Sequence, residues 1–200
     1  MHCRYDDPAA LHHAGLAQHG QSSHPEFPLE RLCRHRCAPF QLTFALIAQR
    51  VLQGRDEVLA VASEAGLAIR GETEDAIDAA MALLAELFGA SVRVGSPRVR
   101  FHHGVTLEQP WMDLKVRCMP ADVAAVSADL IDRDAAIIAC GVEAARLLLH
   151  ARAPLARLLG YRQALQQVTT GGAQHVMSLS HYAPLPQTPG HARAFREMAG

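Results

Sequence analysis

The chain has few of the residues that mark several large classes of protein. Aromatic residues make up only 5% of its 200 residues and include a single Trp, so the composition predicts no aromatic platform for stacking nucleic-acid bases. Its five cysteines are odd in number and scattered, unlike the disulfide framework of a small secreted domain. No segment reaches the roughly 18 uncharged apolar residues that a membrane span needs. These absences predict a cytoplasmic protein with no membrane segment.

The chain also lacks an excess of charge of either sign. Its formal net charge is −1, and Lys115 is its only lysine. Proteins that bind nucleic acid without regard to sequence are usually strongly basic, so a site for a polyanion has to be a local patch here. Half of the residues are hydrophobic, which is enough for one large core or two small ones.

The hydrophobic pattern predicts the order β-α-β-β-α-β over residues 27–101. A strand near 27–33 is followed by a helix after Pro39. The broad apolar face of this helix comprises Leu42, Phe44, Leu46, Ile47, Val51 and Leu52. Two β-rich runs then flank Glu64-Ala65-Gly66, which is typical of a hairpin. Thr73 is a good N-cap for a second helix that ends at Gly89, and a last strand follows.

The same order of elements is predicted again over residues 107–186. The run from Trp111 to Met119 alternates, so that one face carries only apolar residues, namely Met112, Leu114, Val116 and Cys118. A helix follows Pro120, a hairpin turns at Gly141, a helix runs from Pro154 to Val168, and a strand closes the unit at 173–182.

Two such units predict an α+β fold of two consecutive ferredoxin-like βαββαβ sandwiches with antiparallel sheets. Residues 1–26 are rich in histidine and show no sustained periodicity, and residues 187–200 follow a proline-rich stretch. Both ends are therefore predicted to be tails outside the two sandwiches.

The second unit contains a series of residues at the spacings of a family pattern. From Pro154 to Tyr182 the chain aligns with that pattern without a gap. The series comprises Leu107, Glu108, Pro110, Met112, Pro120, Val126, Asp129, Leu130, Pro154, Leu155, Gly160, Tyr161, Leu165, Thr169, Gly171, His181 and Tyr182. In this order the unit resembles the C-terminal, fifth domain of the elongation factor G family, with Gln109 as one extra residue. The first unit is similar to the third domain of that family through Ile69, Gly71, Glu74 and the segment VRVGSPRV at 92–99.

The chain departs from that family in ways that bear on function. Only RFHHGVT, residues 100–106, separates the two units, which is too short for the family's fourth domain. No G-x-x-x-x-G-K-[ST] phosphate loop occurs in the chain, so GTP binding is not expected. Polar family positions are also replaced, at Ala164, at Gln166 and in the helix start at 73–78.

The resemblance implies a translation-related module that binds the ribosome, through ribosomal RNA or a ribosomal protein, without nucleotide chemistry. The alternative is a degenerate paralogue whose sheets mediate protein association without a ribosomal role. The residues show no nucleophile motif, no paired carboxylates and no cofactor motif. We therefore expect no enzyme activity, no catalytic residue, no cofactor and no metal site, and the sequence leaves the oligomeric state open.

One face of a ferredoxin-like sheet carries no helix, and the second unit is predicted to place basic residues there. These candidate RNA- or phosphate-binding residues are Lys115, Arg117, Arg146, His150 and Arg152. Two alternatives stay open: a solvated sheet face partly balanced by Asp113 and Glu143, or a face that packs against the first unit. Arg93, Arg98 and Arg100 form a smaller cluster with the same ambiguity.

The remaining histidines and cysteines are predicted to have plain structural roles. Zinc sites usually need four ligands at defined spacing, and CRHRC at 33–37 has no partner pair. We expect His102-His103 to lie in a turn, and His175 and His181 to share a half-buried strand face with Met177 and Leu179. Cys118 and Cys140 are predicted to be small core residues.

Overall fold

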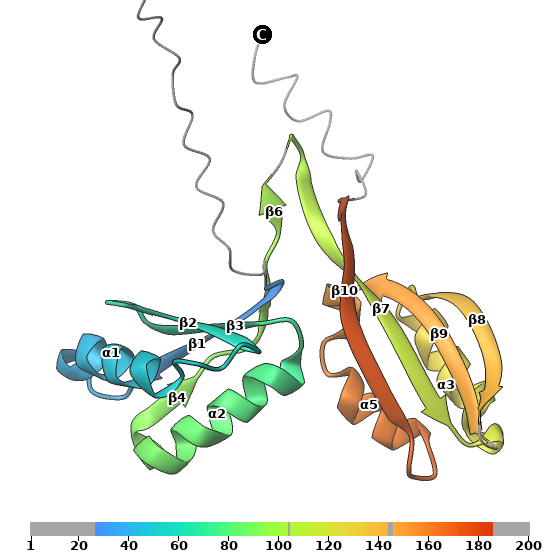
Figure 1. Ribbon diagram of the computed structural model, residues 1–200, viewed down its shortest axis with the longest axis horizontal. Coiled ribbons are helices and arrows are strands. Elements are labelled where there is room, and N and C mark those ends of the chain that lie inside the picture. The colour runs from blue at the N-terminus through green and yellow to red at the C-terminus, as the bar shows by residue number, and fades with distance from the viewer. Residues whose placement is uncertain (1–26, 104, 144–145, 186–200) are drawn as a thin grey trace, which may run out of the picture.

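Two antiparallel sheets, each packed against helices, follow one another along the chain (Figure 1). The computed structural model describes residues 27–103, 105–143 and 146–185. Each sheet has its four main strands in the order fourth, first, third, second of its unit, which is the order of a ferredoxin-like sandwich. The predicted fold class is therefore confirmed. The two predicted tails lie outside the described residues.

The first sandwich consists of the elements up to residue 99. They are β1 (Leu29–His35), η1 (Ala38–Phe40), α1 (Gln41–Val51), β2 (Val58–Ser63), β3 (Gly66–Gly71), α2 (Glu74–Phe88), η2 (Gly89–Ser91), β4 (Val92–Val94) and β5 (Arg98–Val99). The strand order is β2-β3-β1-β4, and β5 also pairs with β1.

The second sandwich follows after the connecting segment. Its elements are β6 (His102–His103), β7 (Leu107–Cys118), η3 (Pro120–Asp122), α3 (Val123–Asp132), β8 (Ala136–Glu143), β9 (Arg146–Pro154), α4 (Leu155–Leu158), α5 (Tyr161–Val168) and β10 (Gln174–Pro184). The strand order is β10-β7-β9-β8, so β7 and β9 are central and β8 is an edge.

Helix α2 begins as its sequence predicts. The Thr73 hydroxyl accepts a hydrogen bond from the Ala76 N–H at 3.3 Å, which satisfies one of the free donors of the first turn. Gly89 ends the helix with a positive φ of 54°. With 15 residues α2 is the longest described helix, and no helix in the described ranges has both the length and the apolar character needed to cross a membrane.

Helix α1 buries only part of the apolar face that its sequence predicts. Phe44 is buried, as is Leu52 directly after the helix. Leu42, Leu46 and Ile47 are instead exposed. The small residues Ala45 and Ala48 are the other buried positions of the helix. Alanines let a helix approach a sheet closely, so the packed face is turned toward these alanines.

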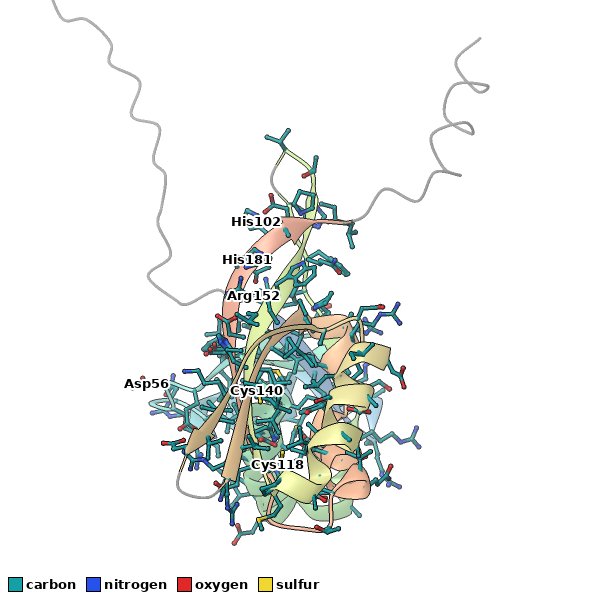
Figure 2. All side chains as sticks on the ribbon, turned by 90° about the vertical axis from the view of Figure 1, so that its right-hand side faces the viewer. Asp56, His102, Cys118, Cys140, Arg152 and His181 are labelled. Carbon is teal, nitrogen blue, oxygen red and sulfur yellow. The ribbon has the colours of Figure 1, made fainter. Side chains whose placement is uncertain are left out.

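The core of the second sandwich is the apolar face of β7, as predicted. Met112, Leu114, Val116 and Cys118 have no exposed surface. The prediction for Cys140 was wrong, because every residue of β8 is exposed. This strand lies at the edge of the sheet, and Figure 2 shows Cys118 and Cys140 at separate places in it.

Two turns differ from the predicted ones. β8 runs through Gly141 to Glu143, so the hairpin turns after Glu143 rather than at Gly141. The predicted helix from Pro154 to Val168 is two helices, α4 and α5, separated at Leu159 and Gly160. Gly160 has a positive φ of 71°, which is the left-handed conformation that glycine adopts readily.

The connecting segment is partly ordered as a strand. His102 and His103 pair with Glu108 and Leu107 of β7, so the prediction of a turn at these histidines was wrong. The pairing makes β6 an added edge on the second sheet, and Figure 1 shows it beside the start of β7.

Candidate nucleic-acid interface

The register of the second sheet places the five predicted phosphate-binding residues on one face. Lys115 of β7 lies directly opposite His150 of β9. Opposed residues of antiparallel strands point to the same side, and so do alternate residues of one strand. Arg117, Arg146 and Arg152 therefore share the face of Lys115. Figure 2 shows Arg152 on the side of the sheet away from helix α3. We call this the open face.

Carboxylates on the open face pair with two of the five residues and lie near a third. The Arg152 Nε donates a hydrogen bond to Asp113 Oδ1 at 2.8 Å, and His150 Nε2 lies 3.6 Å from the same oxygen. Arg117 pairs with Glu143 at 2.5 Å. The hydrogen bond from Arg152 is the main cause that lowers the pKa of Asp113. The predicted balancing by Asp113 and Glu143 is thus present as direct ion pairs.

Two of the basic residues are not held by an acid. Arg146 donates to the Gly172 carbonyl oxygen at 2.6 Å. Lys115 is exposed and forms no ion pair with any residue that the structure describes. The open face thus carries four positive charges from arginine and lysine and two negative charges from Asp113 and Glu143. Its formal net charge is two positive units when His150 is neutral. The open face is moderately basic.

A stacked aromatic pair lies at one end of the open face. The rings of Trp111 and His181 have centroids 6.1 Å apart and planes inclined by 13°, which is an offset stack. His181 is on this face because β10 is irregular between Leu179 and His181, where Ser180 has no partner in β7. An extra residue reverses the side to which the following residues point.

This pair contradicts the prediction for His181. His181 does not share the face of Met177 and is exposed, whereas His175 does share it. The fold thus brings the single Trp beside a histidine on the open face. The irregularity contains no glycine or proline, so the sequence held no signal from which it could have been predicted.

The Cys and His side chains of the CRHRC segment do not come together as the ligands of a metal site would. Cys33 is buried in the core, where burial raises the pKa of its thiol to about 11, so the thiolate that zinc requires is disfavoured. The His35 Nδ1 accepts a hydrogen bond from the Cys37 N–H at 3.0 Å. Across the ranges that the structure describes, no three His, Cys, Asp or Glu side chains are grouped as a metal site would require.

Three carboxylates at the start of α2 reach the second sandwich. Glu72 accepts a hydrogen bond from the Leu179 N–H at 2.5 Å, and Glu74 accepts one from the Gly160 N–H at 2.6 Å. Asp75 pairs with Arg162 at 2.8 Å. These contacts join the first sandwich to α5 and β10, so the open face itself is not the face against which the first sandwich packs.

His175 lies at this junction and lines a cavity of about 230 Å³ between the sandwiches. Its ring meets that of Tyr161 edge to face at 5.6 Å, and its Nε2 is 4.0 Å from Asp75 Oδ2. Burial is the main cause that lowers the pKa of His175, Asp75 opposes this effect, and Arg162 adds to it. The folded protein therefore binds a proton at His175 more weakly than the unfolded chain does.

This shift predicts that stability falls as the solution becomes acidic. The contribution of His175 is fully present above the unfolded pKa near 6.5 and is lost as the pH falls through the lower folded value. We expect the free energy of unfolding to decrease less between pH 7 and pH 5 in His175→Gln than in the wild type, in urea titrations. Equal pH dependence of the two proteins would contradict this prediction.

The three arginines that the sequence groups in the first sandwich, Arg93, Arg98 and Arg100, do not all lie at one site. The Arg100 Nη1 donates to the Phe27 carbonyl oxygen at 2.9 Å. Arg93 and Arg98 are instead exposed and line a common cavity of about 350 Å³. Arg100 thus has a structural bond, while Arg93 and Arg98 are available to a ligand.

Comparison with known proteins agrees with the geometry of both sandwiches. A crystal structure of ttk003000868 from Thermus thermophilus has the same fold, with a TM-score of 0.57 and 16% sequence identity over 88% of this chain and 43% of that one. This chain thus spans less than half the length of that protein. Residues 106–193 match the protein-family model described as elongation factor G C-terminus. The match contains β7 to β10 and confirms the resemblance of the second sandwich to the elongation factor G family.

Proposed function

We propose that this chain is a translation-related module that binds the ribosome through ribosomal RNA, with the open face of the second sheet toward the RNA. One observation carries the proposal: a sandwich that matches the elongation factor G C-terminus presents a net positive sheet face that no described helix covers. Phosphate groups favour such a face because arginine and lysine replace their counterions. The proposed role involves no GTP, no catalysis and no cofactor, and its setting is the cytoplasm.

Co-sedimentation with ribosomes at graded salt tests this proposal. The variant Lys115→Gln/Arg152→Gln removes two charges from the open face. We expect weaker pelleting at every salt concentration, and a plot of log affinity against log salt that is shallower by roughly 2, because each phosphate contact contributes about one to the slope.

The matched control is Arg50→Gln/Arg55→Gln, which removes two exposed arginines from the first sandwich. Its net charge equals that of the open-face variant, so a general charge effect would weaken both equally. Wild-type protein that stays in the supernatant at low salt, or equal losses in the two variants, would contradict the proposal.

Trp111 provides an independent measurement at the same face. It is the only Trp of the chain, and it lies two residue pairs away from Arg152 in the strand register, on the same side of the sheet. RNA bound to the open face changes the surroundings of this ring, so we expect the Trp emission to change on addition of RNA in the wild type. Emission that is constant while ribosomes are bound would place the RNA elsewhere on the protein.

Protein association is the second candidate function, and the edge strand β8 favours it. All eight of its residues are exposed, among them Ile137, Ile138 and Val142. Only Glu143 is charged, and an edge without lysine or proline can accept a further strand from a partner. Pelleting that does not weaken as salt rises would favour this function over RNA binding.

A further inference from the structure

Four arginines of the first sandwich surround a single cavity. Arg34 and Arg36 come from β1 and the residue after it, Arg93 from β4 and Arg98 from β5. All four line the cavity of about 350 Å³, together with Gly95 and Ser96 among others. The sequence places Arg93 near Arg98, but only strand pairing brings Arg34, and with it Arg36 just after β1, to the same cavity. We call these four residues the arginine cluster.

Two members of the cluster are directly opposed. Arg34 of β1 is the register partner of Arg93 of β4. Side chains at opposed positions lie close together, and like charges there destabilise a sheet. Guanidinium groups stay protonated at all physiological pH values, so the repulsion cannot be relieved by loss of a proton. A bound anion would relieve it.

No acidic side chain of the described ranges neutralises the cluster. Its cavity is lined by no carboxylate, and none of the four arginines forms an ion pair with another residue of the described ranges. Glu30 is the register partner of Arg98, but its carboxylate is held by Arg70 at 2.8 Å. The cluster therefore differs from the open face, where Asp113 pairs with Arg152 and Glu143 pairs with Arg117.

Among the described residues, one side-chain hydrogen bond involves the cluster. The Arg34 Nε donates to the Ala65 carbonyl oxygen at 3.1 Å. Every guanidinium carries five N–H donors in a planar fork that matches the oxygens of a phosphate. Four guanidinium groups around one cavity thus provide many more donors than the described residues satisfy.

We propose that the arginine cluster binds phosphate groups of an RNA strand. The inference rests on the proposed function for its choice of polyanion and adds a second contact surface, on the other sandwich. A phosphodiester chain carries a charge on each nucleotide. Arg34 lies on β1, and Arg93 and Arg98 lie on the two strands that pair with β1, at the usual strand spacing of about 5 Å. An acidic peptide satisfies the same forks less completely, since its backbone separates carboxylates with uncharged amides.

The test uses Arg34→Gln/Arg93→Gln in the full chain and a fluorescein-labelled 12-nucleotide single-stranded RNA. We expect the anisotropy titration to show weaker binding and a salt slope lower by about 1.4, because a single strand contributes about 0.7 for each phosphate. Arg50→Gln/Arg55→Gln again serves as the charge-matched control. Its binding and its slope should remain those of the wild type.

Thermal unfolding without RNA separates a ligand site from a structural role. Removal of the opposed charges should raise the melting temperature of Arg34→Gln/Arg93→Gln, while the same change weakens RNA binding. A structural role would instead lower the melting temperature. Weaker binding together with lower stability would therefore overturn the proposal. If the double variant does not fold, the single variant Arg36→Gln, which removes one exposed side chain of the cluster, is used for the same measurements of RNA binding and melting temperature.

The outcomes distinguish this inference from the proposed function. If ribosomes and the oligonucleotide bind the wild type and Arg34→Gln/Arg93→Gln equally, the cluster is not an RNA site, and the open face retains its role. If the cluster variant loses RNA binding while Lys115→Gln/Arg152→Gln does not, the inference holds and the open face is the wrong surface. Loss of ribosome binding without loss of RNA binding would identify a protein ligand and overturn the inference.

Discussion

Replacement of Leu114 by alanine should lower the free energy of unfolding by about 2–5 kcal/mol, the usual range for a leucine truncated in a core. Leu114 has no exposed surface and lies in the middle of β7, the strand next to both β10 and β9. The removed methyl groups leave a cavity that a central strand, paired on both sides, cannot close. Urea titration followed by circular dichroism measures the loss.

Leu148→Ala is the matched control, because it makes the same chemical change on the other face of the same sheet. Leu148 is the register partner of Arg117 on the open face and is only partly buried. We expect a loss well below that of Leu114→Ala. Similar losses for the two variants would mean that the open face is covered in the folded protein, and would remove the surface on which the proposed function depends.

The sequence was sufficient to predict these two faces. The alternation from Met112 to Cys118 allows only one face of the strand to be buried, because a register shift by one residue would bury Lys115 and Arg117 instead. The same argument predicted which face carries the basic residues, and the register agrees. The buried face of a strongly amphipathic strand can thus be predicted without knowing which strands and helices it contacts.

Features that depend on distant partners could not be predicted in this way. The break at Gly160 interrupts an apolar spacing that continues from Leu158 to Leu165, and the Gly160 N–H there bonds to Glu74 of the other sandwich. Gly141 had the residue type of a turn, yet it lies within β8 and has open space around it. Residue type alone did not distinguish these two glycines.

The candidate sites show the same division. The positions of the open face could be predicted, whereas the ion pairs of Arg117 and Arg152 needed the register. Only Arg93 and Arg98 of the arginine cluster could be grouped from the sequence. Arg34 and Arg93 are 59 positions apart and meet through strand pairing. Cross-strand neighbours of this kind follow from topology, which a single sequence constrains but does not specify in detail.

Replacement of Asp122 by alanine should lower the free energy of unfolding by about 1.5–3 kcal/mol, the range for hydrogen bonds to a charged group. Asp122 is 4% exposed. Its carboxylate accepts a hydrogen bond from the Thr170 N–H at 3.1 Å. It also accepts one from the Thr170 hydroxyl, which lies 3.1 and 3.2 Å from the two carboxylate oxygens. The change leaves both donors of Thr170 without this partner. Urea titration of the full chain measures the loss.

Two further variants divide this effect. Thr170→Val removes only the hydroxyl, so its loss should be smaller than that of Asp122→Ala, and the double variant should lose less than the sum of the two. Asp122→Asn keeps an acceptor oxygen and should retain part of the stability. Additive losses for Asp122→Ala and Thr170→Val would show that the two side chains do not interact.

The bond between Asp122 and Thr170 also bears on the open face. It ties the segment after β7 to the loop before β10, and Gly172 of that loop accepts the hydrogen bond of Arg146. We therefore expect Asp122→Ala to weaken ribosome binding slightly through Arg146, while Leu148→Ala, which leaves this loop intact, does not weaken it by that route. Unchanged binding in Asp122→Ala would show that Arg146 does not need the loop in order to meet its ligand.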